Sequence, residues 1–200
     1  VTTPGEISDG SEAVDLAQSP GDIIVLSAAA SDLAMLSAAR ERLPGYGPTL
    51  RFANVLQLGH NMSVDLYLDK TVAKAKLVVV RLLGGVGYWP YGAEQLNILC
   101  RQQGIHLAIL PGDDQPDPEL TETSTLPIQS CHRLWQYFVQ GGPVNAENFL
   151  SYSASLLGDM GDWQEPVQLV RAGLYWPGEA EPTLDHVRSH WPAQGPVAPI

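Results

Sequence analysis

Three short, nearly continuous apolar runs constrain the fold of this chain more than any other feature. They read DIIVLS at residues 22–27, LVVVRLL at residues 77–83 and IHLAIL at residues 105–110. Strands of this composition are buried on both faces, as in a parallel sheet that is covered by helices. Residues 50–56 carry apolar side chains at even spacing, apart from Asn54, and predict a fourth strand near an edge of the sheet.

Stretches with apolar residues at helical spacing separate these runs. They predict five helices, at residues 31–43, 63–75, 90–104, 128–138 and 149–157. Ser31 and Ser63 are expected to cap the first two helices, while Pro90 and Gly104 are expected to begin and end the third. Strands that alternate with helices predict an α/β fold: an open parallel sheet of the flavodoxin or Rossmann type with right-handed crossovers.

The domain organisation predicted from the sequence has three parts. Residues 1–158 hold the N-terminal α/β domain, and residues 159–168 have the polar, acidic composition of a linker. Residues 169–200 then contain one strand (170–176), one helix (184–191) and the VAPI segment, which resembles the start of a further strand. Because one strand and one helix cannot bury their apolar faces alone, we expect a truncated second α/β domain, and hence a piece of a larger protein.

The composition and net charge limit the classes of partner that the chain is expected to bind. The formal net charge of -11 repels phosphate backbones and anionic membranes, so no nucleic-acid or membrane partner is expected. No apolar run is long enough to cross a bilayer, and no signal peptide follows Val1, although the natural start can lie further upstream. Cys100 and Cys131 lack metal-ligand spacing and are expected to be reduced, buried thiols, which indicates a cytoplasmic protein.

In an open parallel sheet, the loops after the strands line the default ligand crevice. Four loops qualify here, at residues 28–31, 59–61, 84–89 and 111–114. The third is the most distinctive, because its glycines, including Gly84 and Gly85, permit close backbone approach and are followed by Tyr88 and Trp89. A dinucleotide fingerprint would need a third glycine where Pro90 stands, so the loop predicts a tight turn or an aromatic-edged surface for another large ligand.

Titratable residues in these loops leave alternatives open. His60 can ligate a metal or donate to a carboxylate, but it has no partner at ligand spacing, so a solvated loop histidine is the simpler interpretation. Asp113 and Asp114 open a run of five acidic residues in ten. That run is either a solvated acidic loop or a set of catalytic or cation-binding carboxylates.

The remaining motifs are weaker. His186 and His190 are spaced as in a zinc-protease helix, but Val187 stands where the glutamate is required and a third ligand is missing. His106, in a predicted strand, and His132, in a predicted helix, are expected to be structural. The sequence contains no P-loop, no G-x-S-x-G and no Cys/His nucleophile motif.

A family resemblance rests on six strings that occur in order between about Ser8 and Ile200. They are SDGSEAVDLAQSPGDIIVLSAAASDLAML, NVLQLGHNMSVDLYLD, VVVRLLGGVGYWPYG, LPGDDQPDPEL, GGPVNAENFLSY and AGLYWPG. Together they resemble the N-terminal region of the large subunit of cobaltochelatase, the CobN type. The magnesium chelatase H subunit is a relative with a looser version of the pattern, notably two glycines before an Asn-rich helix.

The resemblance implies ATP-dependent insertion of cobalt into a corrin ring, hydrogenobyrinic acid a,c-diamide, in cobalamin biosynthesis. It also implies two smaller partner subunits, one of them an AAA+ ATPase that hydrolyses the ATP. Large subunits of this family are several times longer than this chain, so the chain itself is expected to be catalytically silent and to bind no cofactor. Its catalytic residues and any metal site are expected beyond Ile200.

The resemblance further implies that the crevice loops form a wall or lid of the tetrapyrrole channel. Tyr88 and Trp89 would then pack on the macrocycle edge, with Gly84 and Gly85 beneath it. His60 and Arg81 would meet its carboxylates, and Asp113 and Asp114 would face the channel. Two alternatives stay open: a magnesium chelatase subunit acting on protoporphyrin IX, and a non-enzymatic docking domain whose acidic loops meet the ATPase partners.

Overall fold

The computed structural model describes residues 12–43, 45, 47–159, 161–168, 173–179 and 182–191. The chain divides into two compact units, Val1–Val167 and Gln168–Ile200. The first unit contains a sheet of four strands: β1 (Ile23–Ser27), β2 (Leu50–Asn54), β3 (Leu77–Leu82) and β4 (His106–Pro111). Its α-helices are α1 (Ala30–Arg42), α2 (Asn61–Lys70), α3 (Pro90–Gln103), α4 (Pro118–Thr123), α5 (Ile128–Gln140) and α6 (Gly142–Ser155). Three short 3₁₀ helices join them: η1 (Val55–Leu58), η2 (Val72–Lys74) and η3 (Val86–Tyr88).

All four strands are parallel and lie in the order β2-β1-β3-β4, which confirms the predicted open α/β sheet. The chain moves to one side of β1 to form β2, then crosses to the other side for β3 and β4. β1 and β3 are central, and the side chains of residues 23–27 are all buried. β2 is an edge strand, as its alternating pattern predicted.

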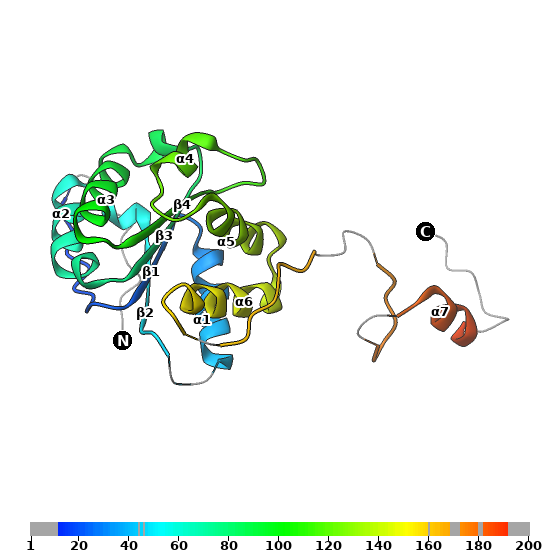
Figure 1. The fold of residues 1–200 in the computed structure, drawn as a ribbon. Coiled ribbons are helices and arrows are strands. Elements are labelled where there is room, and N and C mark those ends of the chain that lie inside the picture. The colour runs from blue at the N-terminus through cyan, green and yellow to red at the C-terminus, as the bar shows by residue number, and fades with distance from the viewer. Residues whose placement is uncertain are drawn as a thin grey trace. The chain divides into compact units, whose positions relative to one another are not determined.

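Helices cover both faces of the sheet (Figure 1). The face with Ile24, Val78 and Val80 packs against α2, α3 and α4, whereas the face with Val25 and Val79 packs against α1, α5 and α6. Two apolar layers therefore enclose the central strands, and these layers explain why the strand sequences are apolar at nearly every position.

The four strands predicted in the first unit are confirmed to within two residues, but two predicted helix caps are wrong. α1 begins at Ala30 without a side-chain cap, because the N-cap position is Ala29 and Ser31 lies inside the helix. α2 is capped by His60, whose Nδ1 accepts a hydrogen bond from the Met62 N–H at 3.1 Å. Ser63 lies inside α2 and accepts a hydrogen bond from the Val14 N–H at 2.7 Å.

The predicted linker contains a segment that is attached to the first unit. We call residues 161–167 the strap; they have no regular secondary structure and contact α5 and α6. The Arg133 guanidinium binds the Glu165 carboxylate at 2.7 and 2.8 Å and lies over the Trp163 ring, 4.8 Å from its centroid. Asn145 forms two hydrogen bonds of 2.8 Å with the Val167 backbone.

In the second unit, α7 (Leu184–His190) confirms the predicted helix and is capped by the Thr183 hydroxyl. The predicted strand at 170–176 lies partly outside the described residues. Its described part forms only an isolated bridge between Trp176 and Glu179. The VAPI segment at 197–200 lies wholly outside the described residues.

Candidate functional site at the carboxyl edge of the sheet

The four predicted crevice loops follow strands whose ends lie side by side. Ser27 at the end of β1 pairs in register with Asn54 of β2 and with Arg81 of β3, and Leu82 pairs with Pro111 of β4. We call this end of the sheet, with its loops, the carboxyl edge. Because β1 is followed by a helix on one face and β3 by a helix on the other, the crevice that such sheets use for ligands lies between these two strands.

A buried polar network occupies that crevice. The Arg81 Nη1 donates to both Asp32 carboxylate oxygens at 2.8 Å, and the Ser27 hydroxyl donates to Asp32 Oδ2 at 2.6 Å. The Arg81 Nη2 donates to the Gly112 carbonyl at 2.7 Å, and its Nε donates to the Pro111 carbonyl at 3.3 Å. The two charged side chains are only 13% and 10% exposed.

These contacts indicate a structural role for Arg81. All three guanidinium nitrogens donate to protein acceptors, and the group also lies 5.0 Å from the centroid of the Phe138 ring. Arg81 thereby joins the first turn of α1 to the loop after β4. A carboxylate ligand would have to compete with the Asp32 carboxylate for the same donors, so the geometry favours Arg81 as a residue that positions the loops.

The loop between β3 and α3 presents one aromatic residue and buries the next. Gly84 and Gly85 have φ angles of +87° and +74°, a region that favours glycine. Tyr88 is 45% exposed at the carboxyl edge. Trp89 is only 6% exposed, and its indole Nε1 donates to the Leu58 carbonyl at 2.8 Å. Tyr88 is therefore accessible to a ligand, whereas Trp89 anchors the loop to η1.

His60 is partly exposed and has a defined hydrogen-bonding role. Its Nδ1 accepts from the Met62 N–H, so the neutral ring carries its proton on Nε2 and can donate there. The Asp113 and Asp114 side chains are exposed, and each accepts a hydrogen bond from Gln115. The Trp135 indole holds the same loop by donating to the Asp113 carbonyl at 2.9 Å.

Sequence reasoning missed an apolar feature of this edge. Leu56 of η1, Met62 of α2 and Leu83 after β3 are exposed, as is Tyr88. We call these four side chains the exposed apolar set. The signal in the sequence was the presence of large apolar residues just beyond the strand ends, where polar loop residues are usual. All four belong to the segments that follow β2 and β3.

The described residues contain no group of three or more histidine, cysteine or acidic side chains placed to hold a metal ion. Cys100 and Cys131 are free and buried, as predicted, and burial raises the pKa of the Cys100 thiol to about 12. In the second unit, the His186 and His190 rings stack with centroids 4.3 Å apart. None of the described helices is long and apolar enough to cross a membrane.

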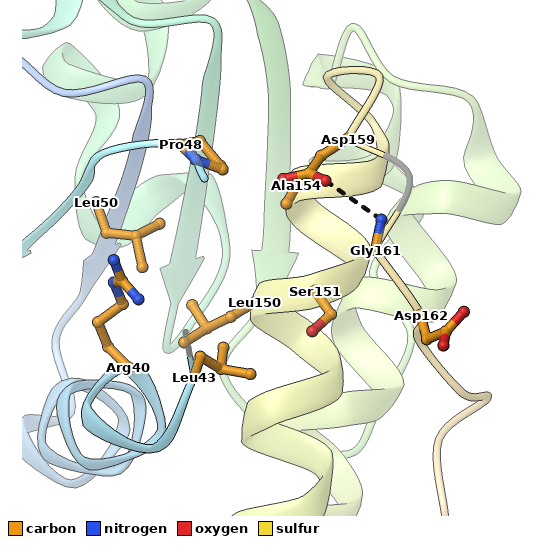
Figure 2. Close-up of a pocket in the computed structure, with 10 residues that line it drawn as sticks. All are labelled: Arg40, Leu43, Pro48, Leu50, Leu150, Ser151, Ala154, Asp159, Gly161 and Asp162. Atoms are coloured by element: carbon orange, nitrogen blue, oxygen red, sulfur yellow. Dashed lines mark hydrogen bonds between the residues drawn. The ribbon is translucent and has the colours of Figure 1, made fainter. Parts of the chain in front are cut away.

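A separate pocket of about 230 Å³ lies at the opposite end of the sheet (Figure 2). Leu43 after α1, Leu50 at the start of β2 and Leu150 of α6 line it together with Arg40 and Asp162. None of the predicted site residues reaches this pocket, so it is distinct from the carboxyl edge.

Comparison with models of protein families finds no match. Comparison with curated proteins finds relatives. The chain is 42% identical over 200 residues to the aerobic cobaltochelatase subunit CobN of Pseudomonas aeruginosa, an alignment that covers 100% of the chain. It is 45% identical over 174 residues, or 87% of the chain, to the aerobic cobaltochelatase subunit CobN of a Sinorhizobium species. The chain belongs to the CobN family.

CobN relatives are much longer than this chain, which spans 16% of the Pseudomonas protein and 14% of the Sinorhizobium protein. A solved structure, the catalytic subunit of cobaltochelatase from Mycobacterium tuberculosis, matches 78% of the chain and 12% of its own chain with a TM-score of 0.59. The identity there is 24%, so this likeness concerns the fold alone. The CobN-family assignment rests on the two sequence alignments.

Proposed function

We propose that this chain is the N-terminal part of the large subunit of an ATP-dependent cobaltochelatase, which inserts cobalt into the corrin hydrogenobyrinic acid a,c-diamide. The identity of 42% to a CobN subunit over all 200 residues carries the proposal. The complete protein would act with two smaller subunits, one of them an AAA+ ATPase that hydrolyses the ATP. The reaction centre lies in the larger, remaining part of the subunit, and this chain contributes a wall of the channel.

The carboxyl edge is the part of this wall that we propose to face the macrocycle. The exposed apolar set, which includes the Tyr88 ring, supplies apolar contact for the flat ring system, and Gly84 and Gly85 let the macrocycle approach the backbone closely. His60 donates from Nε2 to a peripheral carboxylate. Asp113 and Asp114 face the mouth of the channel, where their charge attracts a divalent cation and repels the acidic periphery of the corrin.

Arg81 and Trp89 act differently from the other residues in this proposal. Their hydrogen bonds to Asp32 and to the Leu58 carbonyl hold the loops from below, so they position the binding surface without touching the ligand. Their replacement is expected to loosen the loops before it alters any contact with the macrocycle.

The activity is tested with the complete subunit and its partner subunits. Cobalt and magnesium insertion are measured with hydrogenobyrinic acid a,c-diamide and with protoporphyrin IX. The expected result is ATP-dependent insertion of cobalt into the corrin. Magnesium insertion into protoporphyrin without cobalt insertion would replace the proposal by a magnesium chelatase, and the absence of both activities would reject it.

The binding surface is tested by titrating the complete subunit with the corrin. Tyr88→Ala and His60→Ala are each expected to weaken binding by roughly twofold to tenfold, the loss of one aromatic contact or one hydrogen bond. Ile98→Ala, an exposed apolar residue on α3, is the matched control and should leave affinity unchanged. Unchanged affinity in the first two variants would remove the carboxyl edge from the channel and leave the family assignment intact.

A further inference from the structure

A groove between α4 and α5 adjoins the loop that carries Asp113 but is not part of the binding surface proposed above. It lies beyond the end of β4, has a volume of about 260 Å³ and is lined mainly by apolar side chains. Trp135 lines it as a buried residue, while Ile128 at the start of α5 is 62% exposed. We call it the α4–α5 groove. Ligand sites in proteins are usually concave and mostly apolar, with a few polar groups at fixed positions.

The neighbouring sheet edge is closed to an added strand. The Ser124 hydroxyl accepts from the Ile109 N–H at 2.8 Å, and the Thr125 hydroxyl accepts from the Leu107 N–H at 2.7 Å. These bonds occupy backbone donors of β4 that an incoming strand would use. An occupant of the groove therefore binds through its side chains, as a helix does when it lies in an apolar groove.

The rim of the groove carries uncompensated negative charge. No lysine or arginine occurs between Arg101 and Arg133, and that stretch contains five acidic residues. Asp117 is used as the cap of α4, where it accepts from the Glu119 and Leu120 N–H groups. Glu122 lines the groove, and Glu119 follows the lining residue Pro118 on the same helix; both acids are exposed and form no ion pair with any described residue.

We infer that the α4–α5 groove docks a basic, amphipathic helix of a separate subunit of the complex. Apolar side chains of that helix fill the groove beside Ile128, and its lysines or arginines face the Glu119 and Glu122 carboxylates. Charge complementarity identifies the occupant, since an acidic or neutral helix would leave the rim unpaired. The inference rests on the proposed function only in placing the chain in an assembly of several subunits.

The inference is tested by measuring the affinity of the complete subunit for its isolated partner subunits at about 50 mM and about 500 mM salt. Glu119→Lys/Glu122→Lys is expected to weaken binding at least tenfold at low salt, with a smaller loss at high salt because the Debye length falls from over 10 Å to under 5 Å. Glu41→Lys/Asp69→Lys reverses two exposed acids on α1 and α2 and should leave the affinity unchanged.

Ile128→Ser should weaken binding at both salt concentrations, with Ile98→Ser as its control. Equal affinity of the reversed variant and the wild type overturns the inference.

Thiol labelling at an introduced Ile128→Cys, read by mass spectrometry, tests whether the groove is free before assembly. Cys100 is buried away from the groove and serves as an unreactive internal reference. Fast labelling in the isolated subunit and protection by a partner subunit are expected. Protection without any partner would mean that the same polypeptide covers the groove, which also overturns the inference. Cobalt insertion by the wild-type complex is measured in parallel, so failure of the proposed function is distinguished from failure of the groove.

Discussion

The Asp32–Arg81 pair stands between β1 and β3, where open parallel sheets commonly bind their ligands. Loss of one partner from such a pair leaves a poorly hydrated charge. We expect Arg81→Met, which keeps an apolar stem beside Phe138, to lower the free energy of unfolding by about 3 kcal/mol. Urea unfolding measures the change.

The exposed Arg42–Glu147 pair supplies the control for this prediction. Arg42→Met is expected to cost about 0–1 kcal/mol, because solvent screens the pair. The double variant Arg81→Met/Asp32→Asn should recover part of the loss by removing the unpaired charge. Equal effects of Arg81→Met and Arg42→Met would contradict the buried network.

Asp22 connects the starts of three strands at the opposite end of the sheet. Its carboxylate binds the Lys76 ammonium at 2.9 Å and accepts from the Thr49 hydroxyl at 2.6 Å and the Thr49 N–H at 2.9 Å. The Lys76 contact, followed by the Thr49 hydrogen bonds, holds the pKa of Asp22 well below its ordinary value. The carboxylate therefore stabilises the fold most while it stays ionised.

This depressed pKa fixes the sign of a pH dependence. The stabilisation is fully present above the unfolded pKa of about 3.9 and is lost as the pH falls toward the lower folded value. We expect Asp22→Asn to cost about 1–2 kcal/mol at pH 7 and progressively less below pH 4, in urea unfolding at several pH values. Asp69→Asn, an exposed acid on α2, should give no difference at any pH. A constant cost of Asp22→Asn down to pH 2 would be inconsistent with this linkage.

At the scale of elements, α3 begins against the Trp89 ring. A Cβ at Gly92 would lie 2.0 Å from the ring atom Cε2, whereas a Cβ at Gly87 would meet no atom within 4 Å. Alanine normally stabilises a helix relative to glycine by about 1 kcal/mol, but forcing the indole aside costs about 1–3 kcal/mol. We expect Gly92→Ala to destabilise the chain and Gly87→Ala to be nearly neutral in urea unfolding. Similar stabilities of the two variants would show that the indole is not packed there.

The sequence predicts secondary-structure elements best where most of their side chains are buried. The strands were found because their positions between the helix layers require apolar side chains on both faces. α4 was missed because Leu120 is its only apolar residue between the prolines and acids. The caps of α1 and α2 were misplaced because Ser31 and Ser63 match a local pattern that long-range contacts override, as the bond from Val14 to Ser63 illustrates.

Long-range contacts also limited the prediction of the candidate site. The crevice loops follow from the strand pattern, since parallel strands end at a common edge. Nothing local indicates that Arg81 meets Asp32, 49 positions away, or that Trp89 turns inward to the Leu58 carbonyl while Tyr88 stays exposed. The direction of a side chain after a glycine turn depends on which elements pack beside it, and the local sequence does not contain that information.

At the scale of the whole chain, composition places the end of the first domain at residue 158, but the strap continues to contact α5 and α6 as far as Val167. A chain that ends at Val167 keeps the Trp163 packing, the Glu165 ion pair and both hydrogen bonds between Asn145 and the Val167 backbone. A chain that ends at Gly158 loses them all and leaves Arg133 without its carboxylate. The strap therefore lies within the first compact unit, which extends to Val167.

Truncation tests this boundary. The free energies of unfolding in urea of chains that start at Val1 and end at Val167 or at Gly158 are expected to differ by about 2–4 kcal/mol. Removal of the strap uncovers the Tyr152 ring on which Trp163 packs and leaves several hydrogen-bonding groups without partners. Restoring residues 159–167 with Trp163→Ala and Glu165→Ala should recover only part of the difference, because the hydrogen bonds of Asn145 remain. If both truncated chains are equally stable, the strap contributes nothing and residues 159–167 act as the simple linker that their composition suggests. A stable chain ending at Val167 would also show that the first domain folds without the second unit.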